Sequence, residues 1–267
     1  LAAAAGVPRW LLLAVVTVNL VVGAIAVQSL VFSRAKTVEQ VRRTTTNLAS
    51  LVEANIAGSV QRIDLALLAV VDSLEHQSAG HRLDDEAIEG ILARQLGRLP
   101  EVDALRVSDG EGKVLWGKGV DRTRPASYAD RAFFALHQTA PGARLIVTEP
   151  IMGRVSRLWV IAFTRSYRRP DGSFAGVVAA AVPVSHFTGL ISKVELGPHG
   201  SAVMRRLDYG LVTRFPPVDG PAGTIGDKNT AAEYRALVES GRESGIYHLK
   251  RAPDGIERTY GFHRVRG

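Results

Sequence analysis

The 267-residue sequence contains no cysteine, and aromatic residues make up only 6% of it. The absence of cysteine excludes disulfide-stapled scaffolds, zinc ribbons, thiol-dependent enzymes and iron–sulfur proteins, because each of these classes needs cysteine side chains. Hydrophobic residues nevertheless amount to 46%, which excludes an intrinsically disordered chain. The length allows one or two domains of roughly 100–200 residues each.

Arrangements of residues that carry chemistry are also missing. The seven histidines include no pair at the i, i+4 spacing of metal ligands, and the sequence has neither a Gly-x-Ser-x-Gly elbow nor a phosphate-binding loop. We therefore expect no catalytic activity, no metal and no cofactor. The net charge is +7, but the arginines are scattered and no nucleic-acid-binding motif is present. We expect a solvated basic surface and no nucleic-acid partner.

Charge is absent from one long stretch near the N-terminus. The 24 residues from Trp10 to Ser33 carry no charged side chain and few polar ones, and Arg9 and Arg34 bracket them. Because a spanning helix needs about 20 apolar residues, the sequence predicts a transmembrane helix here. The alternatives are a cleaved signal peptide, with small residues at Ala24 and Ala26, and a buried core helix.

The basic residues around this span leave its orientation open. Arg9 precedes it, whereas Arg34, Lys36, Arg42 and Arg43 follow it. By the positive-inside rule, the side with more basic residues would be cytoplasmic. Because the sequence does not begin with methionine, we expect residues to be missing from the N-terminal side of this count.

Residues 34–78 are predicted to form a long helix, since they contain no proline and a single glycine, Gly58. Apolar residues recur there at steps of three and four, as expected for a helix with one apolar face. They include Val38, Val41, Leu48, Leu51, Val52, Ile56, Val60, Ile63, Leu67, Val70 and Leu74. Such a helix extends about 65–70 Å, so we interpret it as a stalk continuous with the membrane span. Its apolar face can pack on its own domain, on a second copy, or on both, and the stalk either transmits motion or is a passive spacer.

Beyond the stalk, helices alternate with short hairpins. Apolar periodicity predicts helices at 84–99, 128–138, 185–193 and 230–240. Turn residues between apolar runs predict hairpins at 102–116, 158–182, 201–215 and 245–263, with another strand at 144–148. Each half then consists of a hairpin, a loop, a helix and a second hairpin. Antiparallel strands with helices packed on one face form an α+β fold. Because the last hairpin closes where a further strand is expected, we also expect a truncated C-terminus.

Several segments follow one another in an order that resembles a known family. They are SYADRAFF (127–134), TEPI (148–151), WVI (159–161), DGSFAGVV (171–178), GPHGS (197–201), LDYGL (207–211) and DGIER (254–258). Together with the membrane helix and the stalk, they resemble the double Cache sensors, the tandem PAS-like periplasmic domains of bacterial diguanylate cyclases and sensor kinases.

This resemblance implies an α+β fold with five parts along the chain. These are an N-terminal stub at 1–9, a transmembrane helix at 10–33, a stalk helix at 34–79, a membrane-distal PAS-like module at 80–195 and an incomplete membrane-proximal module at 196–267. The resemblance also implies a homodimer in the bacterial inner membrane, with both modules in the periplasm. In the family a second membrane helix leads to a cytoplasmic output domain, so any cyclase or kinase activity would lie outside these residues.

The resemblance further implies a site for a small-molecule ligand in the distal module. In amino-acid-binding members, an arginine and a following aromatic pair hold the ligand carboxylate, and Arg131, Phe133 and Phe134 match that spacing. The residues predicted to bind ligand are Tyr128, Arg131, Phe133, Phe134, Glu149 and Trp159. Phe163 and Arg165 alternate with Trp159 on one strand and could line the same pocket, and the alternative role of Trp159 and Phe163, which we favour, is packing in the core.

Two departures from the family pattern change the expected ligand. The family's aromatic pair is typically Trp-Tyr, and the aspartate that binds the ligand ammonium would fall near Ala181. We therefore expect a carboxylate or another small anion rather than an α-amino acid. In the alternative interpretation, Arg131 forms a structural salt bridge with Asp130 or Glu149, and the two phenylalanines belong to the core. In the proximal module Tyr209, Tyr234 and His248 show no convergent pattern, so no site is predicted there.

The function predicted from these features is extracytoplasmic ligand sensing by a membrane-bound receptor that feeds a diguanylate cyclase (GGDEF) output. The alternatives are the sensor region of a histidine kinase or chemoreceptor, and a membrane-anchored small-molecule binding protein without signalling output.

Overall fold

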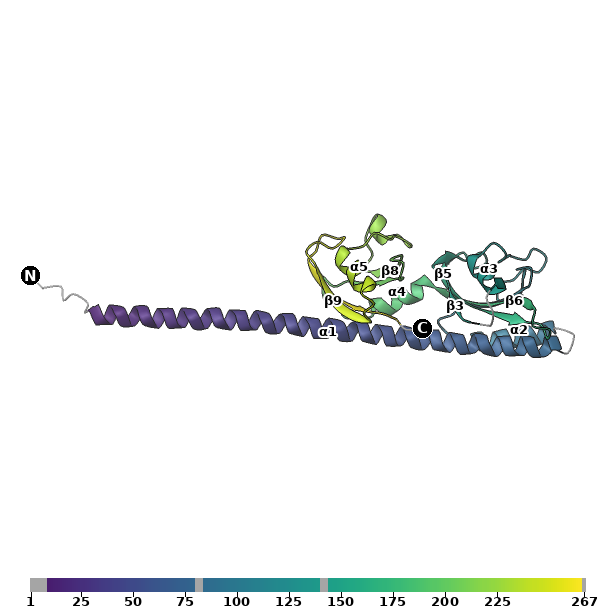
Figure 1. The fold of residues 1–267 in the computed structure, drawn as a ribbon, viewed down its shortest axis with the longest axis horizontal. Coiled ribbons are helices and arrows are strands. Elements are labelled where there is room, and N and C mark those ends of the chain that lie inside the picture. The colour runs from purple at the N-terminus through teal and green to yellow at the C-terminus, as the bar shows by residue number, and fades with distance from the viewer. Residues whose placement is uncertain (1–8, 80–83, 140–143, 266–267) are drawn as a thin grey trace, which may run out of the picture.

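A 71-residue helix, α1 (Arg9–Ala79), runs the length of the molecule, and all the strands lie along one side of its C-terminal half (Figure 1). The computed structural model describes residues 9–79, 84–139 and 144–265. Residues 1–8 of the expected N-terminal stub lie outside the described part. At 1.5 Å per residue α1 extends about 105 Å. The apolar N-terminal stretch and the stalk therefore form one continuous helix, as the sequence predicts.

The two ends of α1 differ in burial. Towards its C-terminus the apolar stripe is buried, and Ile63, Leu67, Val70 and Leu74 are at most 1% exposed. Towards its N-terminus, the described large apolar side chains between positions 18 and 27 are 52–69% exposed. The side chains of residues 11–16, 30 and 31 within the predicted span lie outside the described part.

One helical stretch among the described residues, Glu39–Ser78, is long and apolar enough to cross a membrane by length and composition. However, 39% of its most apolar window is buried inside the molecule, and a buried core helix satisfies the same criterion. Thr17–Ser29 is a shorter apolar stretch, and its side chains are exposed.

The first module comprises the elements from α2 to β6. Its helices are α2 (Asp85–Leu96) and α3 (Ala132–Thr139). Its strands are β1 (Ala104–Asp109), β2 (Val114–Gly117), β3 (Ile146–Val147), β4 (Ile151–Met152), β5 (Trp159–Arg168) and β6 (Phe174–Pro183). They form one antiparallel sheet in the order β2-β1-β6-β5-β3, in which β4 also pairs with β5. The central strand, β6, is thus paired along both edges.

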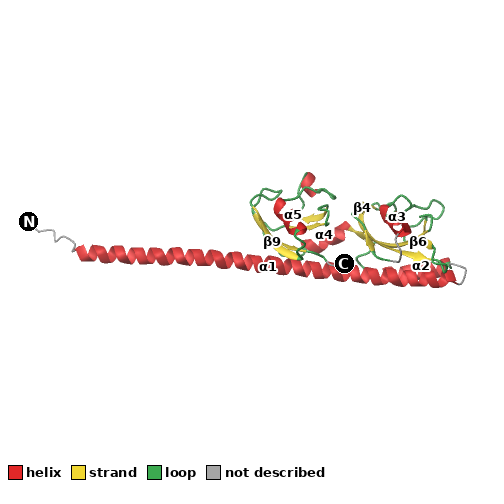
Figure 2. Cartoon of the chain, in the orientation of Figure 1, coloured by secondary structure: helices red, strands yellow, loops and turns green. Residues whose placement is uncertain are grey.

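Helices cover both faces of this sheet (Figure 2). Val178, Ala180 and Val182 of β6 join the main core under α1 and α2, whereas Val177 packs with Phe133 and Phe134 below α3. We expected helices on one face only, and that expectation is wrong. Both faces need cover because β6 is apolar at successive positions, as is typical of a strand buried on both sides.

The second module comprises the elements from β7 to β10, and α4 (Val184–Ser192) contacts both modules. Its elements are β7 (Ala202–Arg205), β8 (Leu211–Phe215), the short helix η1 (Pro221–Gly223), α5 (Ala232–Glu239), β9 (Ser244–Leu249) and β10 (Arg258–His263). β7 pairs with β8 and β9 pairs with β10, giving two separate two-stranded sheets. The order of hairpin, loop, helix and hairpin matches the sequence prediction, but the two hairpins are not joined.

Specific contacts attach the first module to α1. Arg165 of β5 forms an ion pair with Asp64, in which Nε lies 2.5 Å from Oδ1. The Arg168 backbone N–H donates to Glu75 Oε1 at 2.9 Å. Because β5 belongs to the sheet on one side and contacts α1 on the other, a displacement of β5 would reach α1 directly.

Several boundaries differ from the sequence prediction. α3 begins at Ala132 rather than at Tyr128, since Tyr128 lies in a loop whose N–H donates to the Gly112 carbonyl oxygen at 2.7 Å. The strand predicted at 144–148 is reduced to the two residues of β3. Gly112 has φ 86°, and a Cβ there would lie 2.6 Å from Ala129 N, so the close approach of this loop to the β1–β2 turn requires glycine.

Candidate functional site

The first module gathers positive charge around one tyrosine, near the start of α3. Tyr128 is half-buried and packs edge-on against Phe133, with ring centroids 5.3 Å apart. Three residues later, Arg131 Nη2 donates to the Met152 carbonyl oxygen of β4 at 2.9 Å. The Arg131 backbone N–H donates to the Tyr128 carbonyl oxygen at 2.8 Å. This turn holds the hydroxyl-bearing ring and the guanidinium in one short segment.

Two further arginines complete what we call the arginine cluster, namely Arg106, Arg131 and Arg154. Arg106 lies on β1, is 6% exposed, and donates from Nε to the Lys118 carbonyl oxygen at 3.1 Å. Its cross-strand partner is Ala179 of β6, and directly paired residues share one face of a sheet. A small side chain therefore lies beside Arg106 on the face that carries α3.

The charges of the arginine cluster act on Tyr128. Burial raises the pKa of the Tyr128 hydroxyl, and the positive charges of Arg106, Arg131 and Arg154 oppose that rise. Burial lowers the pKa of Arg131, and the neighbouring charge of Arg154 lowers it further. The three guanidinium groups thus each act on the partly buried Tyr128 hydroxyl, and an added negative charge beside that hydroxyl would be stabilised.

One carboxylate accompanies the cluster. Asp130 accepts a hydrogen bond from Arg154 Nη1 at 2.7 Å and another from Nη2. These bonds hold the pKa of the Asp130 carboxyl below its usual range. Asp130 therefore offsets the charge of Arg154, while the Arg131 guanidinium donates to the neutral carbonyl oxygen of Met152.

The structure brings only some of the predicted ligand residues together. Tyr128, Arg131 and Phe133 are adjacent, and Phe134 is 2% exposed and packs on Phe174 at 5.4 Å between ring centroids. Glu149 pairs with none of these residues and accepts from Arg206 Nη1 of the second module at 2.9 Å. Phe133 and Phe134 form part of the core, as the alternative interpretation predicts for them.

Trp159 is the cross-strand partner of Met152, whose carbonyl oxygen accepts from Arg131. It begins β5 and is 44% exposed. Phe163 follows on the same face by strand alternation and belongs to the core under α1, and Arg165 pairs with Asp64 of α1. Phe163 therefore has the core role given as its alternative, and Arg165 does not line the pocket of Arg131, because alternate residues of β5 point to α1 rather than to α3.

The two carboxylates considered as salt-bridge partners of Arg131 pair with other arginines. Asp130 pairs with Arg154, and Glu149 pairs with Arg206. Sequence reasoning missed Arg106 and Arg154. Arg106 lies between Leu105 and Val107 in a buried strand, and a single charged residue in such an apolar run could have marked it as a candidate site residue. The sequence around Arg154 contains no comparable pattern.

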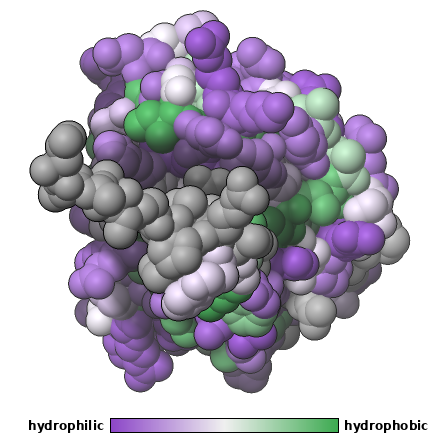
Figure 3. Space-filling model, turned by 90° about the vertical axis from the view of Figure 1, so that its left-hand side faces the viewer, coloured by the Kyte–Doolittle hydropathy of each residue, from purple (hydrophilic) through white to green (hydrophobic). Residues whose placement is uncertain are grey.

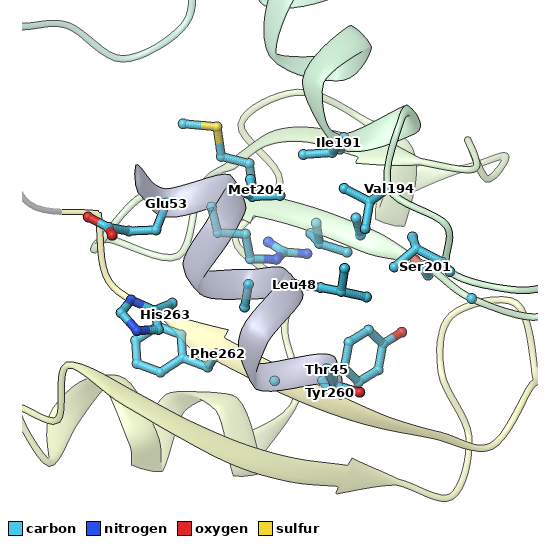
Figure 4. A pocket seen from close by; sticks show the side chains of 18 of the residues that line it. Thr45, Leu48, Glu53, Ile191, Val194, Ser201, Met204, Tyr260, Phe262 and His263 are labelled. Carbon is cyan, nitrogen blue, oxygen red and sulfur yellow. The ribbon is translucent and has the colours of Figure 1, made fainter. Parts of the chain in front are cut away.

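A large groove lies beside the second module, where the sequence predicted no site. Its volume is about 880 Å³, and it is bounded by α1, β7 and β10. We call it the β7–β10 groove, and Figure 4 shows residues that line it, among them Leu48 of α1, Met204 of β7 and Tyr260 of β10. The volume of the groove therefore favours a ligand site in the second module, whereas the positive charge around Tyr128 favours one in the first.

The aromatic residues of the second module do converge, contrary to the sequence prediction. Tyr234 lies 6.5 Å from Tyr209 and 5.8 Å from Tyr247, measured between ring centroids, and Tyr247 stacks on Tyr260 at 5.1 Å. His248 is exposed and bonds Glu257 at 2.9 Å instead. Within the described ranges, no group of three or more His, Asp or Glu side chains could hold a metal ion.

Comparison with known proteins identifies the fold. No family model matches this chain, and no curated protein matches it. The extracellular domain of the candidate histidine kinase rpHK1S-Z16 is similar, with a TM-score of 0.74 and 22% identity over 85% of this chain and 90% of that one.

Two chemoreceptor domains are also similar. The domain of Pseudomonas aeruginosa PctC in complex with GABA has a TM-score of 0.57 and 16% identity over 83% of this chain and 91% of that one. The domain of Campylobacter jejuni Tlp3 in complex with L-valine has a TM-score of 0.54 and 14% identity over 85% and 90%. The chain therefore has the α+β fold of extracytoplasmic sensor domains from histidine kinases and chemoreceptors.

Proposed function

We propose that this chain is the extracytoplasmic ligand-sensing region of a membrane-bound bacterial receptor, and that its first module binds a small anion. The observation that carries the proposal is the arginine cluster around Tyr128. Guanidinium groups form strong paired hydrogen bonds with carboxylates, and these bonds gain strength where water is partly excluded.

The expected ligand is a carboxylate or another small anion rather than an α-amino acid. Ala181, where the family resemblance would require an aspartate for the ligand ammonium, is paired across the sheet with Ala104 and Ala162. An ammonium group placed there would meet methyl groups and the nearby positive charges. Tyr128 and Arg131 remain our proposed ligand contacts, together with Arg106 and Arg154, and Phe133 supports the Tyr128 ring from the core.

The N-terminal part of α1 supports the proposed membrane anchor. Its described apolar side chains are exposed, including Leu20 at 69% and Val27 at 65%. Viewed end-on, the surface of the molecule is predominantly hydrophilic, with smaller apolar areas (Figure 3). Since large contiguous apolar surfaces are rare on soluble proteins, a lipid bilayer would account for this exposure. The proposed division is a span at 10–33, a stalk at 34–79 and modules at 80–195 and 196–267.

The proposed mechanism is a ligand-dependent shift between two arrangements of the sheet and α1. The arginine cluster lies on the α3 side, while Arg165 and Arg168 of β5 bond Asp64 and Glu75 of α1 on the other side. A ligand can shift such an equilibrium only by its difference in affinity for the two arrangements. We propose that α1 carries this shift to the membrane within a homodimer in the inner membrane.

The output of the receptor is a separate proposal. The family resemblance favours a diguanylate cyclase, whereas the similar solved domains come from a candidate histidine kinase and from chemoreceptors. The part of the gene beyond codon 267 distinguishes these outputs from a membrane-anchored binding protein. A second span followed by a cyclase, kinase or chemoreceptor segment supports sensing, and a nearby stop codon contradicts it.

Calorimetric titration of the whole chain in detergent tests the anion site. The probes are acetate, succinate, citrate and L-alanine, and the variant is Arg131→Ala. Loss of one charge-assisted contact costs about 1.5–3 kcal/mol, so an acid that binds should bind roughly 10–100-fold more weakly to the variant.

The matched control is Arg124→Ala, which removes the same charge from an exposed loop of the first module. It should leave the affinity unchanged. Equal affinity of Arg131→Ala and the unaltered chain for the best-bound acid would show that the site is assigned wrongly.

A further inference from the structure

The first module carries a carboxylate of its own at the arginine cluster. Asp130 accepts hydrogen bonds at both of its oxygens from Arg154, and Arg154 Nη1 lies 2.7 Å from Asp130 Oδ1. This two-point contact is the geometry in which a guanidinium and a carboxylate match best. Asp130 therefore presents to Arg154 the same chemical group that the proposed ligand would present.

Arg154 differs in this respect from the other two members of the cluster. Arg131 and Arg106 each donate to a backbone carbonyl oxygen, at 2.9 Å and 3.1 Å respectively. In the part of the chain that the structure describes, neither of these two has a carboxylate as an ion-pair partner. The cluster thus has two arginines that can receive an added anion and a third that is already bonded to Asp130.

The two partners of this ion pair are held to different degrees. The Asp130 side chain is 65% exposed, whereas that of Arg154 is 35% exposed. Arg154 Nη1 also donates to the Ser127 carbonyl oxygen, and Ser127 forms an antiparallel backbone bridge with Lys113. Because an exposed ion pair contributes little free energy, the Asp130 side chain can turn into water while Arg154 stays in place.

We propose that Asp130 is a built-in competitor of the ligand, and that its carboxylate and a bound anion compete for the Arg154 guanidinium. This inference rests on the anion site proposed above and states how that site is regulated. Two carboxylates at one guanidinium repel each other, so each weakens the binding of the other. An anion that bonds Arg131 as well as Arg154 displaces Asp130, because it gains a second guanidinium.

The position of Asp130 in the chain makes the competition permanent. A carboxylate tethered beside its partner competes at a fixed effective concentration, which is of millimolar order for short links. Every anion that uses Arg154 is therefore weakened by a constant factor. The consequence is a higher ligand concentration at which the receptor responds.

The exchange of partners at Arg154 also has a direct route to α1. Arg154 lies in the tight turn between β4 and β5. β5 follows this turn and carries Arg165, whose Nε lies 2.5 Å from Asp64 Oδ1 of α1. Replacement of Asp130 by a ligand anion therefore acts on the turn that leads into the strand bonded to α1.

Calorimetric titration of the whole chain in detergent at low ionic strength tests this proposal. The probes are acetate, succinate and citrate, and the variant is Asp130→Asn, which removes the charge and keeps the shape of the side chain. The best-bound acid should bind roughly twofold to fivefold more tightly to the variant, the range expected for one exposed ion pair. Weaker binding would show that Asp130 positions Arg154 for the ligand, and equal binding would show that Asp130 does not compete. Either result would overturn the proposal.

The matched control is Asp171→Asn, which removes the same charge from the exposed turn between β5 and β6. It should leave the affinity unchanged, because Asp171 accepts from the Ser173 N–H at 2.9 Å and lies at the other end of β5 from Arg154. In a chain that already carries Arg154→Met, Asp130→Asn should bring no gain. An equal gain there would overturn the proposal, since the effect would then come from net charge alone.

The same titrations separate this proposal from the anion site on which it rests. If Arg131→Ala weakens the binding of an acid but Asp130→Asn does not tighten it, the competition alone is wrong. If no acid binds either the unaltered chain or Asp130→Asn at millimolar concentration, the anion site is wrong and the competition with it.

Discussion

The two modules are built from the same order of elements, yet their strands are buried to different degrees. Every residue of β6 from Ala175 to Val182 is buried, whereas β10 alternates between buried and exposed residues before three half-buried ones, and β9 is half-buried or exposed throughout. Hairpins and helices alone therefore do not form a fully buried core. The first module has such a core because β6 is paired on both edges and covered on both faces.

The largest expected effect separates the cores of the two modules. Phe163 is 2% exposed under α1, and Phe262 is half-buried beside the β7–β10 groove. Phe163→Ala should lower the free energy of unfolding by about 3–5 kcal/mol, as for a fully buried phenylalanine. Phe262→Ala should cost clearly less, and denaturant titration followed by circular dichroism measures both. Equal losses would show that the second module has a core as closed as the first.

A second prediction places acid sensitivity in the first module. His137 is buried, and its Nε2 lies 2.9 Å from Thr164 Oγ1. Burial lowers the pKa of His137 to about 4, below the usual value of about 6.5. As the pH falls, His137 of the unfolded chain is protonated near pH 6.5, whereas His137 of the folded chain stays neutral until about pH 4. The free energy of unfolding therefore decreases between pH 6.5 and pH 4. At 1.36 kcal/mol per unit, the loss is about 3 kcal/mol.

Thermal unfolding across this pH range checks the prediction. His137→Gln keeps a hydrogen-bonding group for Thr164 but does not titrate, so its stability should fall less between pH 6.5 and pH 4. The control is His248→Gln, at an exposed position of the second module, which should retain the profile of the unaltered chain. Identical profiles for all three proteins would contradict the assignment to His137.

A third prediction concerns the attachment of the first module to α1. The Arg165 side chain is 13% exposed and that of Asp64 is 26% exposed. Asp64→Ala leaves a mostly buried guanidinium without this partner and should cost about 2 kcal/mol. The matched control is the exposed pair of Arg43 and Glu39 on the same helix, where Glu39→Ala should cost about 0.3–0.5 kcal/mol. Similar costs for both would mean that the Asp64 pair is no anchor.

The smallest effect is expected between the modules. Glu149 and Arg206 pair at 2.9 Å, but their side chains are 66% and 36% exposed. Glu149→Gln should change the free energy of unfolding by less than about 1 kcal/mol, and it should leave anion affinity unchanged because Glu149 pairs with Arg206 rather than with an arginine of the cluster. A large loss of affinity in a calorimetric titration would restore Glu149 to the ligand site.

Much of the fold could be predicted from local sequence patterns. The turn residues between apolar runs placed β5, β6, β9 and β10 within about two residues of their observed bounds, because hairpins depend on neighbouring residues. Long-range pairing was harder. β6 pairs with β1, whereas β7 and β10 do not pair with each other. These pairings depend on residues far apart in the chain, so the local spacing of apolar residues does not predict them.

The candidate site shows the same limit. Tyr128, Arg131 and Phe133 lie in one short segment, so a motif could find them. The charges of Arg106 and Arg154 act on Tyr128 from a separate strand and a separate loop, and only the fold brings them near it. Arg165 was grouped with the pocket because alternation fixes which side chains share a face but does not say which face meets α3, and the structure pairs Arg165 with Asp64 of α1.

Amide hydrogen exchange of the whole chain in detergent, with and without the acid that binds most tightly among acetate, succinate and citrate, decides whether the first module binds an anion. We expect slower exchange in residues 127–134, no change in 202–205 or 258–263, and loss of the effect in Arg131→Ala. Protection confined to the second module, or no protection by any of these acids at millimolar concentration, would contradict an anion site in the first module.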